Sequence, residues 1–217
     1  KATEYRRELN LRDGVVTIRY RVGETVFTRE IFASAVDDTI VMRVTAEGPA
    51  GIDLDVRMQR QEERAKWFGK RGLSLNSGLG GGWPHGVFFS AHVGIDHQGG
   101  EIAAGDQDSG LRSVRGARSV MLTLDGYAYF HKWPGVRSPS WITRDATFEQ
   151  MHERHLADHR AMFDRVALDL GGHDARSLPT DVRLQRVRKG ESDPNLLATY
   201  FQFGRYLLMG SSRPGTL

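Results

Sequence analysis

The sequence predicts an antiparallel β-sandwich that is followed by helices. Over roughly the first two thirds of the chain, short segments rich in β-branched residues alternate between apolar and polar side chains, with glycine-rich turns between them. Near Trp141 the apolar period changes from two residues to about 3.6. The last segment of the 217 residues has the pattern of a well-capped apolar helix. Together these observations predict a β domain before an α domain.

The predicted strands begin with a hairpin. Residues 15–22 and 25–32 alternate in polarity, and Gly23-Glu24 is a plausible two-residue turn between them. Further strands are predicted at residues 39–45 and 52–58. In the second of these, apolar side chains alternate with charged ones, which indicates a sheet with one face in water.

The middle of the chain is predicted to be rich in loops. Residues 78–84, with the sequence GLGGGWP, are not expected to hold a regular element. Strands resume at residues 87–95, 119–124 and 127–130. No helical pattern interrupts this region, so an antiparallel arrangement is expected.

Helical spacing follows, and the boundary between β and α structure is predicted between Trp133 and Ala146. A first helix is expected over residues 148–166, ended by Gly171-Gly172. A short helix is expected to begin after Thr180 as its N-cap.

The terminal helix is expected to begin after Asp193 as its N-cap, with Pro194 at the first helical position, where its missing N–H costs nothing. One broad apolar face needs partners, and we therefore expect the chain to be a fragment of a larger protein. The residues of that face are Leu196, Leu197, Tyr200, Phe201, Gly204, Leu207 and Leu208.

Composition excludes several classes of function. The net charge is +3, from 30 basic and 27 acidic residues that are interspersed, so nucleic-acid binding is not expected. The chain has no cysteine, which excludes disulfides, thiol catalysis and cysteine-ligated zinc. No apolar stretch is long enough to span a bilayer, and the first residues lack the apolar core of a secretory signal.

Three patterns could carry chemistry, and for each a plain structural interpretation is favoured. His152, His155 and His159 share one helical face, but the spacing is not that of a zinc helix, and no metal or cofactor is expected. The glycines after Gly78 lack the lysine of a phosphate loop. The carboxylate pairs Asp37-Asp38, Asp53/Asp55 and Glu62-Glu63 are expected to be exposed surface charges, without the burial that a catalytic acid requires.

Several motifs occur in an order that resembles one known family. The most specific are residues 154–171 (RHLADHRAMFDRVALDLG), 178–184 (LPTDVRL) and 201–217 (FQFGRYLLMGSSRPGTL). Weaker matches are residues 5–11 (YRRELNL) and 28–34 (TREIFAS). The chain resembles glycoside hydrolase family 95, the α-L-fucosidases that act mainly on α-1,2-linked fucose. It departs from the family at Asn10, where aspartate is usual, and at His159, where tyrosine is usual.

The resemblance implies a domain plan. Residues 1–141 would be the later part of a β-sandwich of the galactose-mutarotase-like type, residues 142–192 a helical linker, and residues 193–217 the first helix of an (α/α)₆ barrel. The family inverts the anomeric carbon with a glutamate as acid and an aspartate and asparagines that position water. All of these groups are expected beyond Leu217, so the fragment alone is expected to be inactive.

The resemblance also implies roles for residues in this chain. Gln202, Arg205, Ser211, Ser212 and Arg213 match the scaffold that leads to the active centre, and the two arginines are expected to hold the barrel entry in place by multidentate hydrogen bonding. Stacking of sugar rings on Trp83, Trp133 and Trp141 is an alternative to ordinary packing. The partner would be a fucosylated oligosaccharide or other plant or host glycan, and the location secreted, periplasmic or at the surface of a bacterium.

Two other functions stay open. The chain could be a non-catalytic β-sandwich module that binds carbohydrate or protein and carries a helical tail. It could also belong to an α-L-galactosidase on the same scaffold, because the residues that select the sugar are absent. The oligomeric state is not predicted by any pattern.

Overall fold

The computed structural model describes residues 1–60, 63–64, 66–68, 72–79, 87–103, 109–130 and 146–213. The chain divides into two compact units. The sheet unit comprises Lys1–Asn10 and Val15–His155, and the helical unit comprises Leu11–Gly14 and Leu156–Leu217. The division falls inside helix α1 (Phe148–Phe163).

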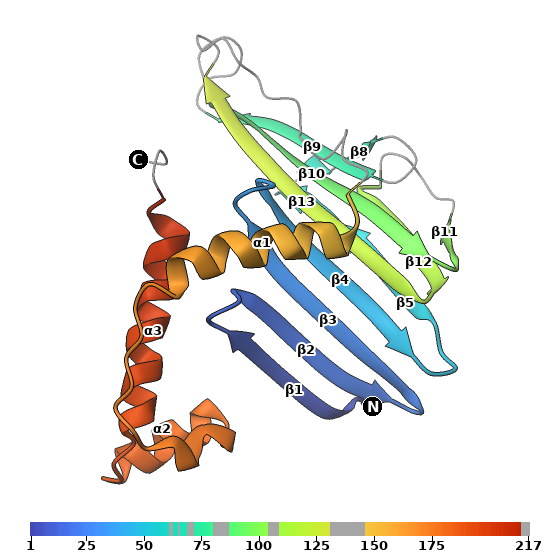
Figure 1. The fold of residues 1–217 in the computed structure, drawn as a ribbon. Helices are drawn as coiled ribbons and strands as arrows, with labels where there is room; N and C mark the ends of the chain where they lie inside the picture. Colours follow the sequence, from blue (N-terminus) through green and yellow to red (C-terminus); the bar gives the residue numbers. More distant parts are fainter. Residues whose placement is uncertain are drawn as a thin grey trace. The chain divides into compact units, whose positions relative to one another are not determined.

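Within the described residues, eight antiparallel strands form the large sheet of the sheet unit (Figure 1). The first four strands pair in sequence order as hairpins, and β13 then adds to β4. The order across the sheet is β1 (Thr3–Asn10), β2 (Val15–Val22), β3 (Thr25–Ser34), β4 (Thr39–Glu47), β13 (Ser119–Phe130), β10 (Val87–Gln98), β9 (Gly72–Leu79) and β8 (Lys66–Phe68).

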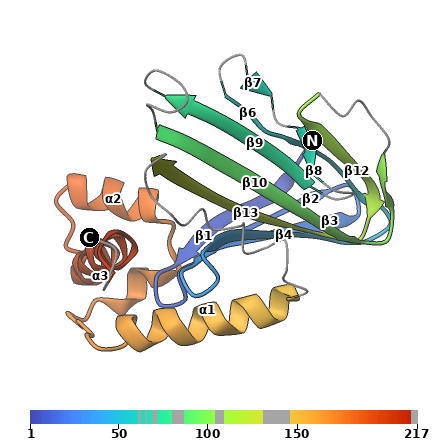
Figure 2. The same cartoon turned by 90° about the horizontal axis from the view of Figure 1, so that it is seen from above.

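A second, smaller sheet completes the sandwich. It has the order β11 (Glu101–Ala103), β12 (Leu111–Ala117) and β5 (Ile52–Arg57), and a separate ribbon joins β6 (Gln59–Arg60) to β7 (Glu63–Arg64) (Figure 2). Both sheets contribute to one hydrophobic core, because apolar side chains alternate inward along each strand. The buried core residues are Val44, Ala46, Ile52, Val56, Leu73, Leu75, Val93, Ile95, Val114, Ala117 and Val120.

The structure confirms the predicted β-sandwich and most of its predicted strands. In β5, Ile52 and Val56 are buried while Asp55 and Arg57 are exposed, as the alternation predicted. The prediction of a loop from residue 78 was wrong at its first two positions, because β9 continues to Leu79. Gly78 pairs there with Phe88 through the backbone, which needs no side chain.

The first half of α1 packs on the face of the large sheet opposite the core. Phe32 is 2% exposed, and its ring lies 5.6 Å from the ring of Phe148 and 4.7 Å from that of His155. The guanidinium of Arg43 lies 3.6 Å from the centroid of Phe148, a cation–π contact, and pairs with Glu149 at 2.5 Å. These contacts fix the start of the helix by aromatic packing.

The helical unit contains the second half of α1, the 3₁₀ helix η2 (His173–Ser177), α2 (Thr180–Arg188) and α3 (Pro194–Ser211). The first predicted helix was too long: α1 ends at Phe163, and Val166, Leu168 and Leu170 lie outside helical structure. Where α1 ends, a side chain of α3 donates hydrogen bonds to the backbone carbonyl groups. These carbonyls therefore have partners without a further turn of helix. Residues 164–172 then run beside α3 (Figure 1).

Three details of the helix ends bear on the predictions: two differ from them and one agrees. Gly171 and Gly172 have φ of 75° and 69° and stand before η2 instead of ending α1. Thr180 is the first residue of α2, whose N-cap is Pro179, so the predicted cap was displaced by one residue. Asp193 caps α3 as predicted, since its side chain accepts a hydrogen bond from Leu196 N at 2.9 Å.

Candidate functional site

The candidate site is formed by α3 and the second half of α1. The scaffold residues predicted from the sequence lie on α3 and directly after its end. The start of α3 is held by a buried arginine. Arg183 donates to both carboxylate oxygens of Asp193 at 2.8 Å and to Asn195 Oδ1 at 3.1 Å. The guanidinium of Arg183 lowers the pKa of Asp193 to about 2. A fully ionised cap is therefore present at neutral pH, where it also favours the positive end of the helix dipole.

Arg205 closes the end of α1. Its Nη1 donates to the carbonyl of Val166 at 3.0 Å, and its Nη2 donates to those of Phe163 at 3.1 Å and Met162 at 3.4 Å. Gln202 supports it, because the amide oxygen of Gln202 accepts from Arg205 Nη1 at 2.5 Å. The planar fork of arginine supplies these several donors at once, which a lysine cannot do.

The end of α3 is also tied to α1. Ser212 N donates to the carbonyl of Leu208 at 2.9 Å, and Ser211 Oγ donates to the same carbonyl at 3.3 Å. Arg213 Nη1 lies 2.7 Å from Asp158 Oδ2, and the two side chains are 22% and 29% exposed. No local sequence pattern connects Asp158 with an arginine 55 residues later.

The loop Leu11–Gly14 packs on the same half of α1. Arg12 donates to both oxygens of Asp164 at 2.8 Å, and Asp13 pairs with Arg160 at 2.7 Å. The sequence does not predict these ion pairs, because the two partners of each pair lie far apart along the chain. The interaction lowers the pKa of Asp164, mainly through its hydrogen bonds with Arg12.

The three histidines of α1 have ordinary packing partners. His152 and His155 lie against Phe32, with ring centroids 5.5 Å and 4.7 Å away. His159 Nε2 is 3.0 Å from the carbonyl oxygen of Leu11, and its ring stacks on Phe163. Within the part of the chain that the structure describes, no group of three potential ligands could hold a metal ion.

The carboxylates selected from the sequence serve as structural acceptors. Asp37 was expected to be exposed, but it is only 3% exposed, because Ser34 Oγ and Arg154 compensate its charge at 2.7 Å each. Hydrogen bonds from Ser113 and then Arg115 lower the pKa of Asp55. A general acid in a glycosidase needs a raised pKa, so Asp55 has the opposite property. Glu62 lies outside the described residues.

A polar row crosses the large sheet on the face opposite the core. Ser74, His92 and Asp125 lie directly opposite one another on β9, β10 and β13. Burial lowers the pKa of His92, whose ring stacks on Tyr127 at 6.0 Å. A nucleophilic serine would need its hydroxyl bonded to the imidazole. The hydrogen bond resolved at Ser74 Oγ is one that it accepts from the amide of Asn76 at 3.1 Å.

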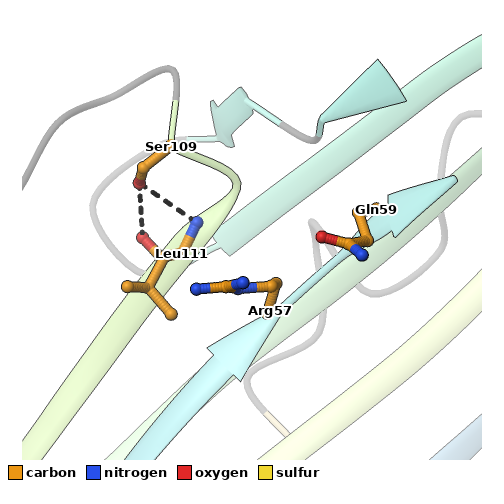
Figure 3. A pocket seen from close by; sticks show the side chains of 4 residues that line it. All are labelled: Arg57, Gln59, Ser109 and Leu111. Carbon is orange, nitrogen blue, oxygen red and sulfur yellow. Dashed lines mark hydrogen bonds between the residues drawn. The ribbon is translucent and has the colours of Figure 1, made fainter. Parts of the chain in front are cut away.

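A small pocket lies on the sheet unit beside β5 and β12. Figure 3 shows its lining, which consists of Arg57, Gln59, Ser109 and Leu111. Its volume is about 220 Å³, smaller than the ~300–1,000 Å³ usual for ligand pockets. Among the lining residues that the structure describes there is no carboxylate, whereas glycoside hydrolysis usually uses a pair of them. The sugar-stacking candidates Trp83, Trp133 and Trp141 lie outside the described residues, as does the predicted domain boundary.

Comparison with known proteins places the chain among the glycoside hydrolases. The family model "Glycosyl hydrolase family 65, N-terminal domain" matches residues 1–133, and the model "Glycosyl hydrolase family 95 catalytic domain" matches residues 147–217. The chain therefore belongs to the glycosyl hydrolases through its family 65 N-terminal domain, and its helical part matches the family 95 catalytic domain. This confirms the resemblance found in the sequence.

Two curated relatives match almost the whole chain. "Alpha-L-fucosidase 2" of Arabidopsis thaliana is 28% identical over 98% of this chain and 29% of its own length. "Probable alpha-fucosidase A" of Aspergillus niger is 23% identical over 98% of this chain and 29% of its own length. The chain thus spans less than a third of the length of these relatives. A solved structure named as a kojibiose phosphorylase from human microbiome aligns at 5% identity and a TM-score of 0.46, over 73% of this chain and 23% of its own.

Proposed function

We propose that the protein to which this chain belongs hydrolyses α-L-fucosides. The observation that carries the proposal is the match of residues 147–217 to the family 95 catalytic domain, in a chain that aligns over 98% of its length with two proteins named as fucosidases. The substrate would be a fucosylated oligosaccharide or other glycan, with fucose in α-1,2 linkage as the main target. The reaction would invert the anomeric carbon.

In this proposal the chain supplies scaffold, and the reacting groups lie in the part of the catalytic domain that residues 1–217 do not cover. Glycoside hydrolysis usually requires two carboxyl groups on either side of the scissile bond. Three carboxylates of the helical unit, Asp158, Asp164 and Asp193, are each bound to an arginine. Such pairing suits a structural role, since it favours the charged form and opposes proton donation.

The domain plan is part of the proposal. Residues 1–141 form the sandwich, residues 142–192 a linker, and residues 193–217 the first helix of the barrel, in which Gln202, Arg205, Ser211, Ser212 and Arg213 support the active centre. We also propose that the protein acts outside the cytoplasm, at the surface or in the periplasm of a bacterium. In the described residues no helix is sufficiently long and apolar to cross a membrane.

The test compares two proteins: the product of the complete reading frame and residues 1–217 alone. Each is incubated with 2′-fucosyllactose, and released fucose is measured. We expect turnover by the first and none above background by the second, because general acid–base catalysis alone contributes about 10²–10⁴ in rate. ¹H NMR of the first product should show the β anomer. Turnover by residues 1–217 would place catalytic groups within this chain and overturn the proposal, as would a complete protein that releases no fucose.

A further inference from the structure

Both ends of α3 are fixed by an arginine–aspartate pair. At its start, Arg183 holds Asp193 with both side chains almost fully buried, at 6% and 7% exposure. At its end, Arg213 holds Asp158 on α1. Between these two points one face of the helix is open, and Leu197, Tyr200 and Leu208 are 63%, 76% and 65% exposed there. The two pairs therefore fix where α3 begins and ends.

The second pair has the properties of a built contact. A surface ion pair such as Arg186–Glu191, with side chains 48% and 46% exposed, is worth little because water and salt screen it. Arg213 and Asp158 are about half as exposed, at 22% and 29%. Their 2.7 Å contact is that of a charge-assisted hydrogen bond. It joins two helices that local sequence does not bring together.

The pair acts where α3 ends. The last helical residue is Ser211, and Ser212 has φ of −139° and ψ of 79°, which is not helical. The last turn of α3 contains no basic residue, and the first basic residue after the helix is Arg213. A cation there could bind the carbonyls of its own helix end. Its guanidinium reaches Asp158 of α1, so the residue that follows the end of α3 is held by a side chain of another helix.

We propose that Asp158 and Arg213 are positioning residues for hydrolysis, an inference that rests on the proposed function. The match to the family 95 catalytic domain continues past Arg213 to residue 217, so the pair lies within that domain. A displacement of about 1 Å in a catalytic group can cost on the order of 10²-fold in rate. The pair fixes the end of α3 against α1 and thereby helps to place the groups that the catalytic domain carries beyond it.

The experiment uses the protein made from its complete reading frame and four variants of it. D158N and R213Q each remove one charge of the pair, and D158N/R213Q removes both. R186Q is the matched control, because Arg186 belongs to the exposed pair in the same unit. We expect kcat on 2′-fucosyllactose to fall about tenfold in each single variant, with KM changed less than about twofold. The double variant should lose no more than the worse single one, and R186Q should match the wild type.

Amide hydrogen exchange at Ser211 and Ser212 gives a second readout that needs no substrate. We expect exchange there to be roughly tenfold faster in D158N and unchanged in R186Q. If D158N melts far below the wild type, D158E keeps the charge on a longer side chain and should give an intermediate kcat. Wild-type kcat in D158N and R213Q, or losses that multiply in the double variant, would overturn the inference. If the complete protein releases no fucose, the proposed function is refuted. Unchanged exchange in D158N would then overturn the present inference as well.

Discussion

Gly14 lies against the ring of His159, so closely that a side chain at position 14 would crowd the ring. A Cβ atom added to Gly14 would stand 3.0 Å from His159 Cε1 and 3.1 Å from Nδ1. Gly14 also has φ of 63°, a backbone conformation that glycine adopts easily and other residues do not. The imidazole that approaches it lies with Nε2 3.0 Å from the carbonyl oxygen of Leu11, to which the tautomer protonated at Nε2 donates a hydrogen bond. The loop and the helix therefore constrain each other through one glycine and one ring.

We predict that Gly14→Ala destabilises the protein more than Gly23→Ala. Gly23 has φ of 58° but nothing within 4 Å of an added Cβ, so its substitution costs only backbone strain, about 1 kcal/mol. Gly14→Ala adds a clash with the ring, for a total of roughly 2–3 kcal/mol. Thermal melting followed by circular dichroism compares the two variants. In an H159A background the extra cost of Gly14→Ala should disappear; if it persists, the ring is not its cause.

Asp193 should make stability depend on pH in acid. Its pKa falls from an ordinary 3.8 to about 2 in the folded protein. Its contribution is therefore complete above pH 4 and is lost as the pH falls through about 2. Asp193→Asn keeps an N-cap oxygen but leaves the buried Arg183 without its carboxylate. We expect D193N to melt on the order of 5 °C below the wild type at pH 6, with the two curves converging near pH 2. Glu191→Gln should show no such difference.

Arg205 should contribute to stability through geometry more than through charge. Arg205→Ala removes the donors to two carbonyl groups in the last turn of α1 and to that of Val166 just after it, which should cost about 2–3 kcal/mol. Arg205→Lys keeps the charge but not the fork, and its loss should be at least half as large. Arg165→Ala is the control, because Arg165 is exposed and its side chain donates to Ala161 in the preceding turn of the chain. Urea unfolding of the three variants measures these differences, and equal stability of R205K and wild type would contradict the prediction.

Residues 1–217 made alone should associate through the open face of α3. Tyr200 and Leu208 are 76% and 65% exposed, and large exposed apolar patches promote association. Analytical ultracentrifugation should show concentration-dependent species that the Y200S/L208S variant largely loses, without a lower melting temperature. Val36→Ser removes an exposed apolar side chain of the sheet unit and should leave association unchanged. Monomeric wild-type chain at high concentration would refute this prediction.

The histidine face of α1 should not bind a transition metal. A zinc site needs nitrogen ligands that converge on one point. The ring of His155 instead stacks on Phe32 at 24° between planes, and His159 Nε2 is engaged with Leu11. Elemental analysis of the purified protein should find zinc and nickel well below one per chain. A stoichiometric metal that is lost on His155→Ala would contradict this.

The sequence by itself determined the order and type of most elements. Strong alternation marked β2 to β5, and the cap and proline at Asp193 and Pro194 marked the start of α3. Strands with weaker patterns were missed: β1 is charged and mostly exposed, and β9 and β12 contain glycine and serine. Their strand conformation comes from pairing with neighbours, because a ladder of backbone hydrogen bonds can hold residues whose own preferences are weak. The end of α1 was misplaced for a similar reason, since Arg205 supplies its cap from another helix.

The candidate site followed the same division. Motif order in the sequence identified the family and selected Gln202, Arg205 and Arg213 as scaffold residues. Only the tertiary structure assigned their partners: the carbonyls at the end of α1 for Arg205, and Asp158 for Arg213. Local patterns record which residues share a helix face or a strand face, because those spacings follow from the backbone repeat. Pairing between charges 55 residues apart depends on how the chain folds back on itself, and no local repeat encodes it.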